Sequence, residues 1–216
     1  MHTIIWDWNG TLLNDLDLCI STINVLLKKR RLPLLERNSY KEVFSFPVKE
    51  YYGSIGFDFE TEDFALPAKE FIDLYDARVE NCLLHDSVIE VLSFFKEKGT
   101  RQFVLSAMKQ NMLEETLRHN NIFHFFESVA GLNNHYAVSK IERGEQLISE
   151  FNIEKERTLI IGDTIHDFEV AEKLGIKSIL ISDGHQSKKR LKETGALILP
   201  KLNKILDSKT AFRILK

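Results

Sequence analysis

Short apolar runs alternate with amphipathic stretches over most of the chain. Six runs have the length and composition of strands buried in a parallel sheet: residues 4–6, 102–105, 128–130, 158–161, 178–181 and 196–199. Between the later runs, apolar residues recur at helical spacing in residues 88–98, 110–119, 142–151 and 168–174. Strands that alternate with helices of this length predict an α/β fold with a doubly wound parallel sheet.

Residues 16–84 interrupt this alternation with a segment that is mostly helical. Helical spacing is found in residues 15–31, 39–51 and 66–83, where Pro33 ends the first helix and Pro47 interrupts the second. The sequence therefore predicts two domains, an α/β core of residues 1–15 and 85–216 and a helical insert of residues 16–84. An insert that directly follows the first strand must lie over the carboxyl end of the sheet, above Asp7.

Composition and charge narrow the function classes. The chain has 216 residues, of which 44% are hydrophobic and 28% charged, and its formal net charge is −3. No Lys/Arg block is long enough to indicate nucleic acid as a partner, and no apolar span or leader segment indicates a membrane. Cys19 and Cys82 have no metal-type spacing, which favours a reducing compartment, so we expect a cytoplasmic protein.

Candidate chemistry falls where apolar strands end or helices begin. Asp7, Ser106, Lys140 and Asp163 occupy such positions, and Asp167 follows four residues after Asp163. The carboxyl ends of parallel strands meet at one crevice, so these side chains are expected to converge. Facing carboxylates repel unless a cation joins them, and few carboxylates with water and substrate oxygens suit Mg²⁺ better than Ca²⁺. A phosphoryl group fits this set: Asp7 attacks, Lys140 neutralises charge and Ser106 donates a hydrogen bond.

Four motifs in this order resemble those of the haloacid-dehalogenase-like (HAD) superfamily. They are Asp7-Trp8-Asn9-Gly10-Thr11 for D-x-D-G-T, Val104-Leu105-Ser106, Ser139-Lys140, and Gly162-Asp163 followed by Asp167 for G-D-x-x-x-D. The resemblance covers essentially the whole chain and implies a Rossmann-like core with a helical cap, as in phosphoglycolate-phosphatase-like members. It also implies a Mg²⁺-dependent phosphatase that acts on a small phosphorylated metabolite.

The same resemblance assigns roles to individual residues. Asp7 is expected to be the nucleophile that becomes an aspartyl phosphate, and Ser106 and Lys140 are expected to assist catalysis. Asp7, Asp163 and the main-chain carbonyl of Asn9 are expected to bind Mg²⁺, with Asp167 supporting the ion directly or through water. The aromatic stretch of residues 51–59 is expected to pack inside the insert and is also the candidate for substrate selection.

Asn9 is the departure from the family pattern, which usually has a second Asp that protonates the leaving oxygen and later activates water. An amide does neither, and losing such a group costs about 10²–10⁴-fold in rate. The loss of rate is expected to be smallest for substrates with good leaving groups, such as aryl or acyl phosphates. Three explanations stay open: a slow or specialised phosphatase, a phosphate-binding protein without turnover, or a substitution of an original Asp. A phosphonatase-like hydrolase, with Lys49 or Lys41 forming a Schiff base, is a further alternative.

Overall fold

A six-stranded parallel sheet forms the centre of the molecule. The computed structural model describes residues 2–132 and 139–207. The strands lie in the order β3-β2-β1-β4-β5-β6, and every neighbouring pair is parallel. Their bounds are β1 Thr3–Trp6, β2 Arg101–Lys109, β3 Ser128–Leu132, β4 Thr158–Gly162, β5 Lys177–Ile181 and β6 Leu197–Leu199. The predicted α/β fold class with a parallel, doubly wound sheet is confirmed.

Two strands extend more than one residue beyond their predicted ends: β3 ends at Leu132 rather than at residue 130, and β2 extends further. The predicted strand ends at Ser106, whereas β2 continues to Lys109 with a shift of register between Leu105 and Lys109 against β3. Ala107 and Lys109 are exposed, so this extension has no continuous apolar pattern from which it could be predicted.

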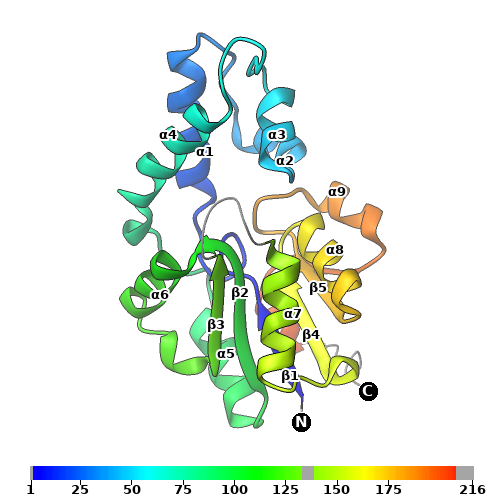
Figure 1. The fold of residues 1–216 in the computed structure, drawn as a ribbon. Helices are drawn as coiled ribbons and strands as arrows, with labels where there is room; N and C mark the ends of the chain where they lie inside the picture. Colours follow the sequence, from blue (N-terminus) through cyan, green and yellow to red (C-terminus); the bar gives the residue numbers. More distant parts are fainter. Residues whose placement is uncertain (1, 133–138, 208–216) are drawn as a thin grey trace.

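Helices cover both faces of the sheet because alternate strand residues point to opposite sides. Ile5, Phe103 and Ile160 pack with helices α7 and α8, whereas Ile4 and Trp6 belong to the cluster on the other face. Figure 1 shows α7 and α8 on one side of the sheet and α5 on the other. The helices of the core are α5 Val88–Glu97, α6 Gln110–His119, α7 Lys140–Glu150, α8 Ile165–Leu174, α9 Lys188–Leu191 and α10 Lys204–Asp207.

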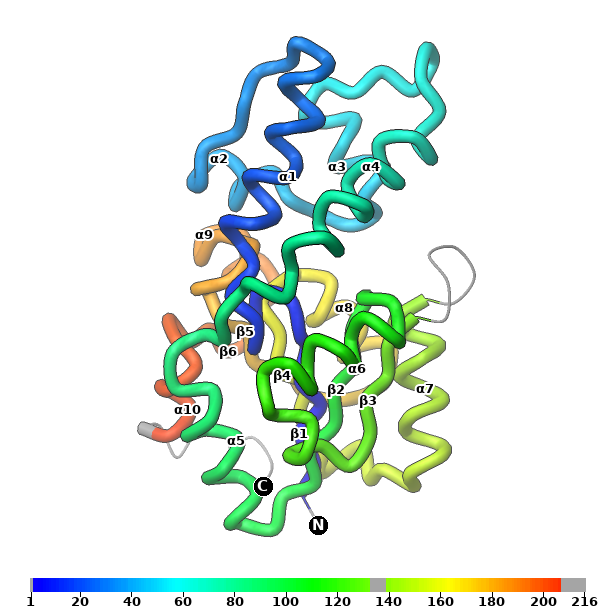
Figure 2. The backbone as a smooth tube through the Cα atoms, turned by 90° about the vertical axis from the view of Figure 1, so that its left-hand side faces the viewer, coloured from blue at the N-terminus to red at the C-terminus, as the bar shows by residue number. Residues whose placement is uncertain are grey.

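The helical insert stands beyond the carboxyl end of the sheet (Figures 1 and 2). Its helices are α1 Leu16–Lys29, α2 Arg37–Val43, α3 Val48–Ser54 and α4 Ala65–Asp76, followed by the 3₁₀ turn η1 Val79–Asn81. Pro47 separates α2 from α3, as its position predicts. The two chain connections to the core lie side by side, since Asn14 N donates to Leu83 O and His85 N donates to Leu12 O, both at 2.9 Å. The division into two domains at these connections stays a prediction.

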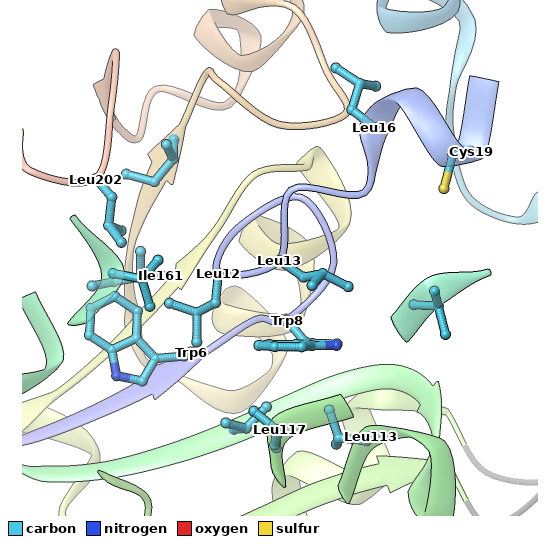
Figure 3. Close-up of a cluster of buried hydrophobic side chains, with 14 of the residues drawn as sticks. Trp6, Trp8, Leu12, Leu13, Leu16, Cys19, Leu113, Leu117, Ile161 and Leu202 are labelled. Atoms are coloured by element: carbon cyan, nitrogen blue, oxygen red, sulfur yellow. The ribbon is translucent and has the colours of Figure 1, made fainter. Parts of the chain in front are cut away.

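Large apolar side chains connect the sheet to the insert without a break. Trp6, Trp8, Leu12 and Leu13 are fully buried, and Figure 3 shows them together below Leu16, which lies at the start of α1. They belong to one cluster that includes side chains from both the sheet and the insert. These side chains therefore hold the loop after β1 against both the sheet and the insert, and they fix the position of the loop residues that lie between Trp8 and Leu12.

No helix in the described ranges is both long and apolar enough to span a bilayer.

Candidate active site

The turn after β1 places the first motif at the edge of the sheet. Asp7 N donates to Ile161 O at 2.8 Å, so pairing with β4 continues one residue beyond β1, and the Asp7 side chain is 7% exposed. Gly10 has φ +72°, and a Cβ there would lie 2.4 Å from an oxygen of Asp163. A side chain at position 10 would therefore displace Asp163 as well as strain the backbone.

Three carboxylates and one lysine meet at this edge. Oxygens of Asp7, Asp163 and Asp167 lie within 4.8 Å of one another, and all three residues are buried. Lys140 Nζ lies 2.6 Å from Asp7 Oδ1 and 2.5 Å from Asp167 Oδ1. Thr11 Oγ1 donates to Asp163 Oδ1 at 2.9 Å. The four charged side chains that the sequence places at strand ends and helix starts are thus brought together.

The electrostatics of this cluster favour a bound cation. Burial, with the charge of Asp167 in support, raises the pKa of Asp7 well above its usual value despite the opposing effect of Lys140. Burial also raises the pKa of Asp163 to about 6 against the opposing charge of His185. Burial would lower the pKa of Lys140, but Asp167 and Asp7 raise it above its ordinary value. One lysine does not neutralise three carboxylates, so the cluster has room for further positive charge.

Asp167 has a structural role in addition to its place in the cluster. Its Oδ2 accepts from Thr164 N at 3.0 Å while Asp167 N donates to Thr164 Oγ1 at 3.4 Å, and these two hydrogen bonds form a capping box at the start of α8. The Thr164 hydroxyl also donates to the same Oδ2 at 2.7 Å. Asp163 N donates to the same oxygen at 3.2 Å. Both oxygens of Asp167 are therefore occupied by protein donors, one by the helix start and one by Lys140.

Asn9 and Ser106 lie next to each other on the same side of the cluster. Ser106 is fully buried and its Oγ donates to Asn9 Oδ1 at 3.4 Å, while Met108 N donates to Ser106 Oγ at 3.0 Å. Asn9 Nδ2 donates to Asp15 Oδ2 at 2.9 Å and to the Tyr75 hydroxyl at 2.7 Å. Both amide hydrogens are thus held by the protein, and Asn9 presents only its oxygen toward Ser106.

A buried Asp15–His185 pair beside Asn9 was missed by the sequence analysis. His185 Nε2 lies 3.0 Å from Asp15 Oδ1, and His185 N donates to Asp163 Oδ2 at 2.6 Å. Burial would lower the pKa of His185, but Asp15, followed by Asp163 and Asp7, raises it to about 9. Burial would raise the pKa of Asp15, but His185 holds it at about 2. The sequence did contain one signal for His185, which is its position: it lies in the loop after β5, at the same edge of the sheet as the other strand ends.

A cavity of about 780 Å³ opens from this cluster toward the insert. Asp7, Asn9 and Lys140 line one end of it, and side chains of α2, α3 and α4 line the other. Tyr51 and Tyr52 of the predicted aromatic stretch are buried in the insert and also line the cavity. The insert therefore contributes walls to the site, as its place after the first strand predicts.

Comparison with known proteins identifies the family. The family described as "Haloacid dehalogenase-like hydrolase" matches residues 4–181. The chain belongs to this family. It is 24% identical over 189 residues to "Phosphoglycolate phosphatase" of Caulobacter vibrioides, an alignment that covers 85% of this chain and 80% of that protein. It is 22% identical over 191 residues to "Pyrophosphatase PpaX" of Bacillus mycoides, with 84% of each chain covered.

Solved structures agree with the fold of this HAD-like chain. A "predicted phosphatase" from Clostridium acetobutylicum superposes with a TM-score of 0.82 at 20% identity, covering 97% of this chain and 99% of that one. Protein Tyrosine Kinase A (PtkA) of Mycobacterium tuberculosis gives a TM-score of 0.81 at 20% identity, with 96% and 97% covered. At these identities the structures support the fold alone. The family match and the curated relatives confirm the predicted family and enzyme class.

Proposed function

We propose that this HAD-like hydrolase is a Mg²⁺-dependent phosphatase that acts on a small phosphorylated metabolite through an aspartyl-phosphate intermediate. The observation that carries the proposal is the position of Lys140, which joins Asp7 to Asp167 next to Asp163 at the carboxyl edge of the sheet. A nucleophile, a fixed cation and a carboxylate cluster in one buried site are the components that phosphoryl transfer requires.

Each side chain has a definite task in this reaction. Asp7 attacks phosphorus, and Lys140 holds Asp7 in place and offsets negative charge on the transferred group. The Ser106 hydroxyl accepts from Met108 N and, as a donor, makes only a long contact to Asn9, so its hydrogen can turn to a phosphoryl oxygen. Asp167 acts through Lys140 and the start of α8, so we assign it a positioning role.

Asp7, Asp163 and the main-chain carbonyl of Asn9 would hold Mg²⁺, with Asp167 supporting the site. The donors fit this ion because they are hard oxygen ligands, and burial, which raises the pKa of both Asp7 and Asp163, makes a nearby positive charge favourable. When bound, Mg²⁺ supplies positive charge that neutralises phosphoryl oxygens. Asp163 is oriented for this role by Thr11 and by the backbone N–H of His185.

The proposal is tested by phosphate release from a panel of phosphate esters, with Mg²⁺ and with EDTA. We expect Mg²⁺-dependent release that Asp7→Asn abolishes, and acid-stable phosphorylation of the protein chain that is lost in the same variant. Asp7→Asn keeps the size of the side chain and a hydrogen-bond acceptor but removes the nucleophilic charge. Binding of inorganic phosphate without turnover of any ester would contradict the proposal and favour a phosphate-binding protein.

A phosphonatase-like reaction is the second candidate, and the position of Lys49 favours it. Lys49 lines the cavity that contains Asp7, whereas Lys41 Nζ donates to Ser182 O at 3.0 Å on the core. A Schiff base would therefore form at Lys49. Borohydride trapping with phosphonoacetaldehyde tests this directly: labelled protein that Lys49→Arg no longer gives would support it, and unlabelled protein would eliminate it.

A further inference from the structure

The cavity over the cluster has an apolar lining that a small polar leaving group would not use. Its volume of about 780 Å³ lies in the range of sites that enclose whole organic ligands. Most of the insert residues that line it are aromatic or aliphatic, including Phe44, Phe64 and Phe71. Met108 and Met112 contribute from the core side. A substrate that does not cover these apolar surfaces would leave them in contact with water. It would then lose most of the binding free energy that burial of the surfaces provides.

Charged groups on the insert side give no support to an anionic leaving group. Among the described insert residues that line the cavity, only Lys49 and Asp76 are charged, and their charges are opposite. Lys49 is exposed, and its ammonium group lies 5.7 Å from the centre of the Phe59 ring. The fixed cation of the site, Lys140, already pairs with two carboxylates. On the core side, the exposed Lys109 and Glu169 also line the cavity, so among the described lining residues most charged groups belong to the core and the insert side is mainly apolar.

Asn9 supplies a second and independent constraint. Both of its amide hydrogens are bound by Asp15 and Tyr75, and its oxygen is an acceptor. At the position where family members usually have an acid, this chain has no proton to give. An ester whose leaving oxygen can depart as an anion, because its conjugate acid is itself acidic, is least affected by the lack of an acid at position 9.

We infer that the substrate is a phosphate monoester of an aromatic hydroxyl compound with a flat apolar ring system, bound in the cavity between the cluster and the insert. This inference rests on the proposed phosphatase function. Asp7 forms a bond to phosphorus while the bond from phosphorus to the ring oxygen breaks, and the electron pair stays on that oxygen. The aryl oxide leaves as an anion stabilised by its ring and takes a proton from water. Water then hydrolyses the aspartyl phosphate, which releases inorganic phosphate and restores Asp7.

The inference has two requirements, an apolar ring and a good leaving group, and four esters test them separately when kcat/KM is measured with Mg²⁺. 2-Naphthyl phosphate satisfies both, phenyl phosphate has a smaller ring, benzyl phosphate keeps a ring but has a poor leaving group, and phosphoglycolate lacks both. We expect the order naphthyl, phenyl, benzyl, phosphoglycolate, with benzyl below phenyl by about 10²-fold or more because no acid assists it. A higher kcat/KM for phosphoglycolate than for both aryl esters would overturn the inference while the phosphatase function stands. No turnover of any ester would overturn the proposed function, and the inference with it.

A matched pair of variants tests where the ring binds. Phe71 is half-buried, lines the cavity and stacks on Tyr75 with ring centres 5.9 Å apart. Leu74 is a half-buried apolar residue of the same helix, α4, that is not among the lining residues. We expect Phe71→Ala to lower kcat/KM for 2-naphthyl phosphate about tenfold relative to acetyl phosphate, and Leu74→Ala to leave that ratio unchanged. An unchanged ratio in Phe71→Ala, or equal losses in both variants, would place the ring elsewhere and overturn the inference.

Discussion

At the scale of single residues, Asn9 and Asp15 depend on each other. The Asn9 amide donates to Asp15 Oδ2, and Asp15 is also bound by Tyr75 and His185. An Asp at position 9 would place a second carboxylate against Asp15 in a buried site. We therefore expect Asn9→Asp alone to lower the free energy of unfolding by about 1–3 kcal/mol. Urea unfolding at pH 7 measures this loss.

The double variant Asn9→Asp/Asp15→Asn reverses the donor and the acceptor and restores the hydrogen bond. We expect it to raise kcat for benzyl phosphate above the parent by about 10²-fold or more, because an acid is again present. Its stability should stay below that of the parent, because His185 loses the charge of Asp15. Phenyl phosphate is the control, since its leaving group needs less assistance. Asn9→Asp that is as stable as the parent and fully active on benzyl phosphate would show that Asp15 does not constrain position 9.

The His185–Asp15 pair predicts a specific pH dependence of stability. The pKa of His185 is raised from 6.5 to about 9, so the pair contributes fully below pH 6.5 and its contribution is lost as pH rises through 9. In EDTA we expect the free energy of unfolding to fall by up to about 3 kcal/mol over this window. His185→Gln, which keeps a donor but cannot ionise, should lack this fall. Parallel curves for the two proteins would show that His185 is not charged in the fold.

These residues also show what the sequence can and cannot reveal. Asp7, Lys140 and Asp163 could be predicted because each follows a strand or begins a helix, and parallel topology brings such positions together. Asp15 resembles an ordinary helix-start residue in the sequence, although its side chain caps nothing in α1. Its partner His185 is 170 residues away, so only the folded chain shows that the two form a pair.

At the scale of elements, the start of α8 links helix formation to the site. Asp167 caps the helix through Thr164 with one oxygen and binds Lys140 with the other. Asp167→Asn keeps an acceptor for the cap but loses the charge that faces Lys140, whereas Asp167→Ala loses both. We expect the Ala variant to be less stable than the Asn variant by about 1 kcal/mol in urea unfolding. Equal stability of the two variants would mean that the cap contributes nothing.

Strands could be predicted where a continuous apolar run marks their whole length, and their ends could not be predicted where that run stops before the strand does. The strands β1, β4 and β5 are continuous apolar runs, and their bounds agree with the prediction to within a residue. β2 extends beyond Ser106 through alternately exposed residues, because pairing of Lys109 with Leu132 of β3 maintains it. That pairing is a contact between residues far apart in the sequence, so no local sequence pattern predicts it.

At the scale of the whole molecule, the insert is held over the site by contacts between α2 and the loop after β5. The Tyr40 hydroxyl lies 3.1 Å from His185 Nδ1, and Gln186 Nε2 donates to Phe44 O at 2.9 Å. These contacts involve loops and backbone carbonyls, which sequence patterns do not pair. The sequence could place the insert above Asp7 from its point of insertion, but it could not identify which surfaces meet. We propose that these contacts hold the insert closed over a bound substrate.

Arg190 offers the sharpest test of that closure. Arg190 belongs to α9, and its guanidinium donates hydrogen bonds to the main-chain carbonyls of Phe44 and Lys41 in the insert. Its side chain is half-buried where the core meets the insert. Arg190→Ala removes these hydrogen bonds without touching the cluster, so we expect KM for the best ester to rise about fivefold, with faster amide exchange over residues 41–47. Lys189→Ala, an exposed neighbour in the same helix, is the control and should change neither quantity. If exchange over residues 41–47 is unchanged in Arg190→Ala, the hydrogen bonds of Arg190 do not hold the insert. Closure then depends on the other contacts of this junction, which are the hydrogen bonds of Gln186 and Lys41 and the aromatic contacts with His185.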